Sequence, residues 1–177
     1  MFRFQGIPIV IKRILLFVAV VIFSALQNTD GLLPSVFGAR FFILIPLIIS
    51  IGMFEGELAG LFYGMIAGCF WDVCSAGPDG FHGFYLALAG CLSGILVHFV
   101  MRNWILSQYC LCATATAIHS IIYWLATIYI PIGDSGYSKL LGFYLPSAII
   151  TTAFSFIIYY MVRFICTNLK ENQAQMT

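Results

Sequence analysis

The chain has 177 residues, of which 62% are hydrophobic and 8% are charged, and its formal net charge is +1. A water-soluble domain carries about 25% charged residues, so this composition excludes a soluble globular protein. The near-neutral charge provides no basic field, and we expect no nucleic-acid partner. The sequence therefore predicts a single integral membrane domain over residues 1–177, with the lipid bilayer as its solvent.

Six apolar stretches follow one another along the chain, and each is a candidate for a membrane-spanning helix, which needs about 20 apolar residues. They cover residues 14–27, 36–53, 56–74, 81–101, 104–130 and 140–166. Pro46 predicts a kink in the second stretch. The connections are short, and 77–80 (GPDG) is the clearest turn, because proline and glycine both favour turns. The predicted fold class is an all-α membrane protein, a six-transmembrane-helix bundle.

The distribution of basic residues predicts the orientation of this bundle. If the N-terminus is cytoplasmic, the inside segments hold Arg3, Lys12, Arg13, Arg102, Arg163 and Lys170. The outside segments hold only Arg40 and Lys139. The positive-inside rule therefore predicts that both termini are cytoplasmic (N-in/C-in). Glu55 and Glu57 then fall in a cytoplasmic turn that has no basic residue of its own.

Glycine recurs every four residues through the third predicted span. The positions are Gly56, Gly60, Gly64 and Gly68, and Gly52 precedes them at the same step. Four residues turn about 400° around a helix, so these glycines share one face. The fourth predicted span carries Gly83, Ala87, Gly90 and Gly94. Small residues let lipid-embedded helices approach closely, so we expect these two spans to form a closely packed antiparallel hairpin.

Asp72 follows the glycines at the same four-residue step and ends the third predicted span. A carboxylate there is costly unless it is paired or lies at the membrane interface. Three roles are open: it caps the turn by accepting backbone N–H bonds, it pairs with His82, or it contacts a partner protein. Asp79 and His82 lie at the same outer rim, and the three residues are our candidates for turn capping or partner contact.

Polar side chains line one face of the fifth predicted span. They are Thr116, His119, Ser120, Tyr123 and Thr127. Their spacing is helical, so they point in one direction. This face could line a ligand cavity, or it could form hydrogen bonds with a neighbouring helix.

The sequence around the third and fourth spans resembles the central signature of MreD, the rod shape-determining membrane protein family. From Gly60 to Asp72 the chain reads GLFYGMIAGCFWD, and from Ser75 it continues as SAGPDGFHG into a glycine-bearing apolar stretch. The matching positions are Gly64, Gly68, Asp72, Ser75, Gly80 and His82. The motif covers about a quarter of the chain, and the residues Cys69, Trp71 and Asp79 are less typical of the family at their positions.

The MreD resemblance implies a non-enzymatic scaffold of the bacterial cell-elongation machinery, located in the inner membrane. It implies MreC as the partner and, through MreC, the MreB filament and the peptidoglycan synthases of the lateral wall. The chain is also similar in size, helix number and glycine spacing to the substrate-binding subunits of energy-coupling-factor vitamin transporters. That resemblance gives the alternative function, vitamin binding for transport.

Residue patterns typical of enzymes are not found in the sequence. It contains no His-Glu-x-x-His, no Gly-x-Ser-x-Gly and no phosphate-binding loop. His98 and His119 lie about 18 Å apart in depth at 1.5 Å per residue, so they cannot hold one haem. We therefore expect no catalytic residue, no metal ligand and no cofactor, and the binding of a small molecule stays open.

Overall fold

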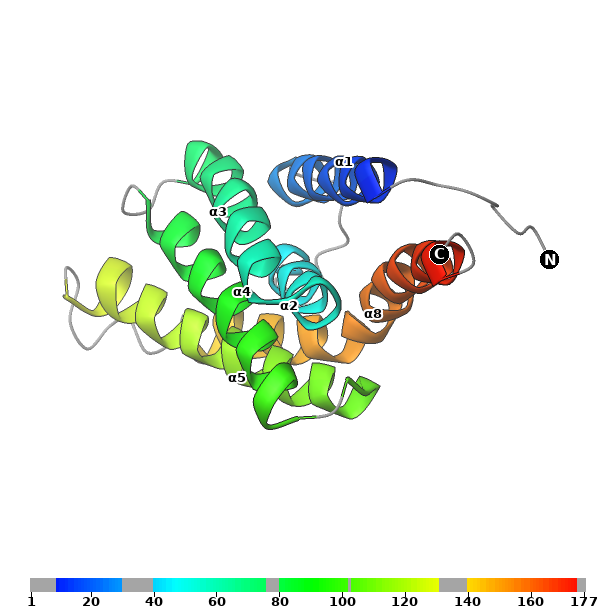
Figure 1. The fold of residues 1–177 in the computed structure, drawn as a ribbon. Coiled ribbons are helices and arrows are strands. Elements are labelled where there is room, and N and C mark those ends of the chain that lie inside the picture. Colours follow the sequence, from blue (N-terminus) through cyan, green and yellow to red (C-terminus); the bar gives the residue numbers. More distant parts are fainter. Residues whose placement is uncertain (1–8, 30–39, 76–79, 102, 131–139, 175–177) are drawn as a thin grey trace.

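The computed structural model describes residues 9–29, 40–75, 80–101, 103–130 and 140–174, and regular structure within these ranges is helical (Figure 1). The elements are α1 (Ile9–Asn28), α2 (Leu44–Glu55), α3 (Glu57–Cys74), α4 (Phe81–Phe99), α5 (Ile105–Trp124), the π-helical turns η1 (Leu125–Tyr129) and η3 (Leu140–Tyr144), and α8 (Leu145–Ala174). The predicted all-helical fold class is confirmed.

Five of these helical stretches are long and apolar enough to cross a membrane. They are Val10–Asn28, Glu57–Cys74, Phe81–Phe99, Ile105–Tyr129 and Leu140–Thr167. The last two each join an α-helix to a π-helical turn, η1 after α5 and η3 before α8. These helices define a multi-pass membrane protein, and each of the five corresponds to a predicted span. Four agree within two residues at both ends, and the first begins four residues earlier than predicted.

The second predicted span differs from the prediction. Within the described residues it is α2, a helix of 12 residues. At 1.5 Å per residue this helix is about 18 Å long, well below the ~30 Å hydrocarbon core of a bilayer. The predicted kink at Pro46 is wrong: Pro46 lies in the first turn of α2, where the missing N–H is tolerated. Residues 36–39 of the predicted span lie outside the described residues.

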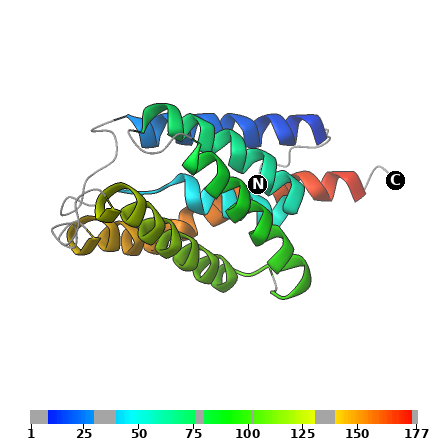
Figure 2. The same cartoon turned by 90° about the vertical axis from the view of Figure 1, so that its left-hand side faces the viewer.

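Helix α2 is the core of the bundle. Ten of its 12 residues are buried, and it contacts α1, α3, α4, α5 and α8. A helix that is apolar on all sides is one that protein surrounds, and Figures 1 and 2 show the longer helices arranged around α2. The predicted hairpin of α3 and α4 lies on one side of α2.

The backbone that enters α2 is not helical, and side chains of other helices satisfy it. The N–H of Phe42 donates to Thr151 Oγ1 of α8 at 3.0 Å, and the N–H of Leu44 donates to Gln27 Oε1 of α1 at 3.0 Å. Non-helical backbone at membrane depth is tolerated only where protein supplies hydrogen-bond partners. The short α2 is therefore held at its start by two of the helices that surround it.

A buried ion pair ties α1 to the turn between α2 and α3. Lys12 Nζ lies 2.7 Å from Glu55 Oε2, and the two side chains are 11% and 13% exposed. Glu55, which has no basic neighbour in its own turn, thus obtains one from α1. The start of α1, the α2–α3 turn, the end of α4 and the later half of α8 share one end of the bundle (Figure 1). We call this the basic end, because Lys12, Arg13 and Arg163 belong to it.

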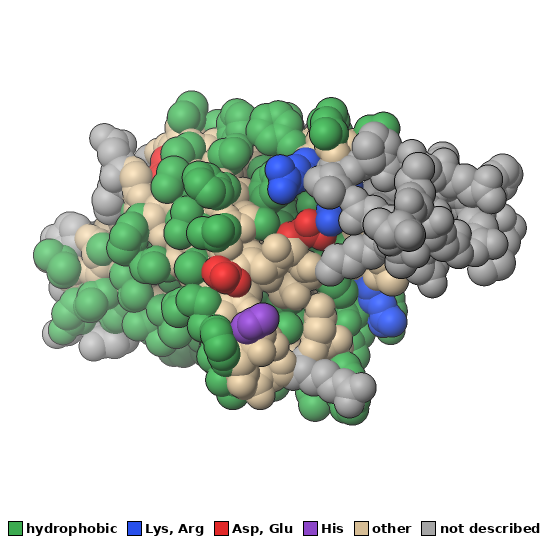
Figure 3. Space-filling model, viewed as in Figure 1, with side chains coloured by type: hydrophobic (Ala, Val, Ile, Leu, Met, Phe, Trp, Pro, Cys, Tyr) green, Lys and Arg blue, Asp and Glu red, His purple; other side chains and the backbone are tan. Residues whose placement is uncertain are grey.

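Apolar side chains dominate the face of the molecule that Figure 3 shows. On α3 and α4, Val73 is 86% exposed and Phe84 is 70% exposed. Such exposure is costly in water but suits side chains that face lipid tails. The lipid-facing sides of the helices thus point outward, while their small residues point toward one another.

Candidate functional site

Helices α3 and α4 touch backbone to backbone along the glycine face. A Cβ atom built on Gly60 would lie 2.6 Å from the carbonyl carbon of Gly90. One built on Gly64 would lie 2.6 Å from the carbonyl carbon of Leu86 and 2.9 Å from Cα of Ala87. Non-bonded heavy atoms do not approach this closely, so each position requires glycine in this packing. We call this contact the glycine seam.

The seam continues toward both ends of the hairpin. A Cβ on Gly68 would lie 2.5 Å from the backbone N of Gly83, and one on Gly94 would lie 2.5 Å from the backbone N of Glu57. Gly83 itself has more room, because the nearest atom to its Cβ would be Asp72 Oδ2 at 3.3 Å. The two helices are therefore in close contact from the α2–α3 turn to the end of α3.

A glycine of α2, Gly52, also belongs to the seam. A Cβ on Gly60 would lie 2.9 Å from Cα of Gly52, and one on Gly90 would lie 2.7 Å from Cγ2 of Ile48. The sequence placed Gly52 in the second predicted span, and the structure brings that residue against Gly60 of the third. The seam is thus a three-helix contact that fixes the hairpin against the core.

Gly56, which the four-residue step assigned to the packing face, has a different role. It lies between α2 and α3 with φ +94°, and a Cβ there would meet nothing within 4 Å. Its N–H donates to the carbonyl of Gly52 at 2.9 Å. Gly56 is required for the sharp reversal of the chain and not for side-chain clearance.

Asp72 connects the two helices at the hairpin mouth, the end of the hairpin where α3 ends and α4 begins. Its Oδ1 accepts from the backbone N–H of His82 at 3.0 Å and from Nδ1 of His82 at 2.8 Å. Its Oδ2 accepts from the backbone N–H of Gly83 at 2.8 Å. The N-cap residue of α4 is Gly80, at φ 79°, with no side-chain cap. Asp72 therefore accepts hydrogen bonds from the free N–H groups at the start of α4, although it belongs to α3. An N-cap side chain ordinarily does this within its own helix.

These contacts combine two of the roles that the sequence left open for Asp72. It caps backbone N–H groups, those of α4, and it pairs with His82. The carboxylate is only 11% exposed and the His82 side chain only 2%. Asp79, the third candidate at this rim, lies outside the described residues.

An aromatic cluster surrounds His82 and extends to α5. The His82 ring stacks on Trp71 with ring centres 4.1 Å apart, and it lies 5.4 Å from His119 and 5.1 Å from Tyr123. Trp71 also stacks on His119, with ring centres 5.2 Å apart. The sequence placed His82 at the outer rim of the hairpin and His119 on the polar face of the fifth predicted span, and it did not predict their contact. Depth counted along each helix ignores tilt, and α5 with η1 runs past the start of α4 (Figure 1).

The polar face of α5 points inward. Thr116 Oγ1 lies 3.4 Å from Thr152 Oγ1 of α8, which is a hydrogen bond to a neighbouring helix. His119 is 1% exposed, and neither of its ring nitrogens has a hydrogen-bond partner in the described part of the chain. Ser120 Oγ is also buried without such a partner among these residues. The face thus contributes more to packing around Trp71 than to hydrogen bonding.

The described residues contain no group of three or more His, Cys, Asp or Glu side chains placed to hold a metal ion. No family model, curated protein or solved structure matches the chain. The functional conclusion therefore depends on the sequence motif and on the geometry of the hairpin. That geometry is a rigid, closely packed helix pair, capped at its mouth and joined to α2 and α5.

Proposed function

We propose that this chain is a non-enzymatic membrane scaffold of the MreD type in the bacterial cell membrane. In this proposal it belongs to the rod-shape machinery that builds lateral peptidoglycan. It binds MreC and, through MreC, acts with MreB and the peptidoglycan synthases. It acts by binding: it holds the membrane-embedded or juxtamembrane segment of a partner in a fixed position.

One observation carries the proposal. Four of the MreD-like positions, Gly64, Gly68, Asp72 and His82, form one continuous contact between α3 and α4. The motif residues therefore build a single structural unit, the glycine seam closed by the Asp72 cap. A unit of this kind supports a scaffold, because it holds a helical surface in place.

The proposed orientation has both termini in the cytoplasm. Among the described basic residues, Lys12, Arg13 and Arg163 belong to the basic end, and Arg40 precedes α2 at the opposite end. An excess of Lys and Arg marks the cytoplasmic side of a membrane protein. This distribution supports placing the basic end in the cytoplasm and the hairpin mouth outside.

The experiment is affinity purification of the tagged full-length chain from a mild detergent extract, with mass spectrometry of proteins and small molecules. Resin without the chain measures the background. The proposal predicts that MreC co-elutes in an amount comparable to the chain. Absence of MreC together with a stoichiometric vitamin would contradict it and favour the transporter-subunit alternative.

A further inference from the structure

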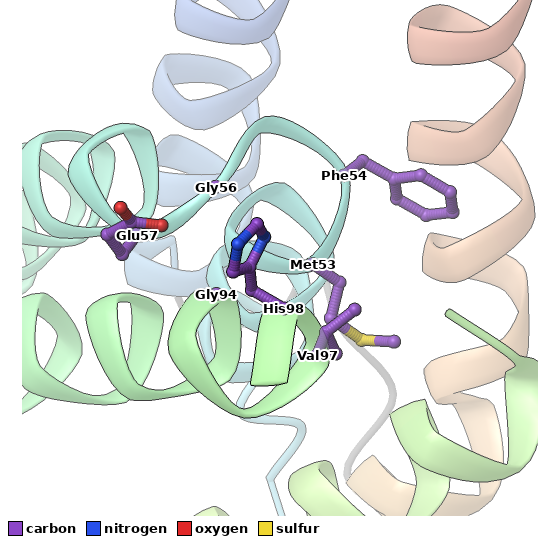
Figure 4. A pocket seen from close by; sticks show the side chains of 7 residues that line it. All are labelled: Met53, Phe54, Gly56, Glu57, Gly94, Val97 and His98. Atoms are coloured by element: carbon purple, nitrogen blue, oxygen red, sulfur yellow. The ribbon is translucent and has the colours of Figure 1, made fainter. Parts of the chain in front are cut away.

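A hollow of about 330 Å³ opens at the basic end of the hairpin, beside the α2–α3 turn (Figure 4). It is lined by Met53, Phe54, Gly56, Glu57, Gly94, Val97 and His98. Three helices contribute to it: the last residues of α2, the first residue of α3 and the last turns of α4. Its volume is within the ~300–1,000 Å³ range of small ligand sites, which is enough for a long side chain.

The lining divides into an apolar floor and a polar rim. Met53 is buried, and Gly56 contributes backbone only, with nothing within 4 Å of the position where its Cβ would lie. Gly94 packs against the backbone of Glu57 at the side of the hollow. Glu57 and His98 are exposed, and both belong to the lining (Figure 4). The hollow therefore offers apolar surface below a single carboxylate and an imidazole.

Among the described residues, no Lys or Arg forms an ion pair with the carboxylate at the rim. The structure gives Glu55 the Lys12 ammonium at 2.7 Å but gives Glu57, two residues later, no ion pair within the described residues. Glu57 is the first residue of α3, where the helix dipole favours a negative charge. The hollow thus holds a fixed negative charge that an incoming cation can neutralise.

We propose that this hollow receives a Lys or Arg side chain from the cytoplasmic end of a partner's transmembrane helix. The alkyl part of that side chain lies over Met53 and Val97, and its charged group meets Glu57. Transmembrane helices carry their Lys and Arg at the cytoplasmic end, and these side chains bury their stems while keeping the charge at the interface. No Lys or Arg lines the hollow among the described residues, so a cation fits it better than a phosphate-bearing lipid headgroup.

This inference depends on the proposed scaffold function, and a crosslinking experiment tests it separately. A photo-crosslinking amino acid replaces Val97 in the full-length chain, and the control carries it at Phe84, exposed near the opposite end of α4. We expect an adduct with the partner from the Val97 position and none from the Phe84 position. The crosslinked partner residue should lie within about one helical turn of a Lys or Arg at the cytoplasmic end of the partner's transmembrane helix. An adduct with lipid, or with a partner segment that has no basic residue, would overturn the inference.

Charge reversal provides the second measurement. Glu57→Lys should lower the bound-to-free ratio of the partner about tenfold, and Glu57→Gln should lower that ratio less. When the crosslinked basic residue of the partner is changed to Glu, the partner should again bind the Glu57→Lys variant. Leu58→Lys is the control, because it places the same lysine side chain one residue away, outside the hollow, and leaves Glu57 in place. If the wild type captures MreC and Glu57→Lys captures it equally well, this inference fails and the proposed function stands. If the wild type captures no MreC, the proposed function itself fails.

Discussion

The carboxylate of Asp72 lies 2.8 Å from Nδ1 of His82 and caps the helix on which His82 lies. An acidic residue in the last turn of a helix is ordinarily disfavoured, because that end carries partial negative charge. Here the same carboxylate faces the free N–H groups at the start of α4, where a negative charge is favoured. One side chain thus links the end of α3 to the start of α4.

Replacement of Asp72 should destabilise the protein in proportion to the acceptors lost. Three N–H groups converge on its two oxygens, so Asp72→Ala leaves all three without this partner, and Asp72→Asn keeps one acceptor oxygen. We expect Asp72→Asn to cost about 1–3 kcal/mol of stability and Asp72→Ala to cost more. Thermal unfolding in detergent measures both variants.

Thr114→Ala is the control for this pair, because Thr114 is exposed and its hydroxyl bonds only to carbonyls of its own helix. An Asp72→Ala variant that unfolds at the same temperature as Thr114→Ala would show that the cap contributes nothing. If Asp72→Asn loses partner capture while its unfolding temperature is unchanged, the carboxylate has a charge-specific role instead.

The glycine seam could be predicted from the sequence because its period is local. Residues four apart share a helix face whatever surrounds the helix, so Gly60, Gly64 and Gly68 were assignable without a structure. The role of α2 could not be predicted in the same way. An apolar stretch is typical both of a spanning helix and of a helix buried by protein, and only packing distinguishes them.

Contacts between distant helices were the part that the sequence did not reveal. The approach of His119 to His82 depends on helix tilt, which no residue pattern records. The Lys12–Glu55 pair and the hollow beside Glu57 depend on which helices become neighbours. The turn between α2 and α3 could be predicted only in part. The sequence shows a glycine at position 56, but it does not show that this residue has a positive φ.

A single methyl group in the seam should be strongly destabilising. Gly60→Ala places a Cβ against the carbonyl group of Gly90, which is backbone and cannot rotate away. We expect a loss of about 1–3 kcal/mol or more, measured as a lower unfolding temperature and a smaller monodisperse peak in size-exclusion chromatography. Gly142→Ala is the control, because a Cβ there meets nothing within 4 Å. Equal behaviour of the two variants would refute the tight packing at Gly60.

At Gly56 the cost of alanine should come from backbone conformation alone. The residue has φ +94°, and space is open around the position where a Cβ would lie. Gly56→Ala should therefore cost about 1–3 kcal/mol through strain at positive φ. Gly56→Ser should behave like Gly56→Ala, because size does not matter in open space. A much larger loss for serine than for alanine would indicate a steric contact instead.

The pair of Lys12 and Glu55 should show strong coupling in a double-mutant cycle. Each side chain is mostly buried, so removing one partner leaves a charge without its counter-ion. Lys12→Met and Glu55→Gln should each cost about 3–5 kcal/mol, while the double variant should cost less than the sum. Chemical or thermal unfolding of the four proteins gives the coupling. Additive losses would mean that the two residues do not act as a pair.

The most direct test of the scaffold is quantitative MreC capture by seam variants that remain folded. Gly68→Leu forces α3 away from the backbone of Gly83, whereas Gly142→Leu adds the same side chain where nothing lies within 4 Å. The measurement is the ratio of MreC to tagged chain in the monodisperse detergent-extracted fraction. We predict that Gly142→Leu keeps the wild-type ratio and that Gly68→Leu loses capture. A wild-type ratio for Gly68→Leu would contradict a scaffold that depends on the seam.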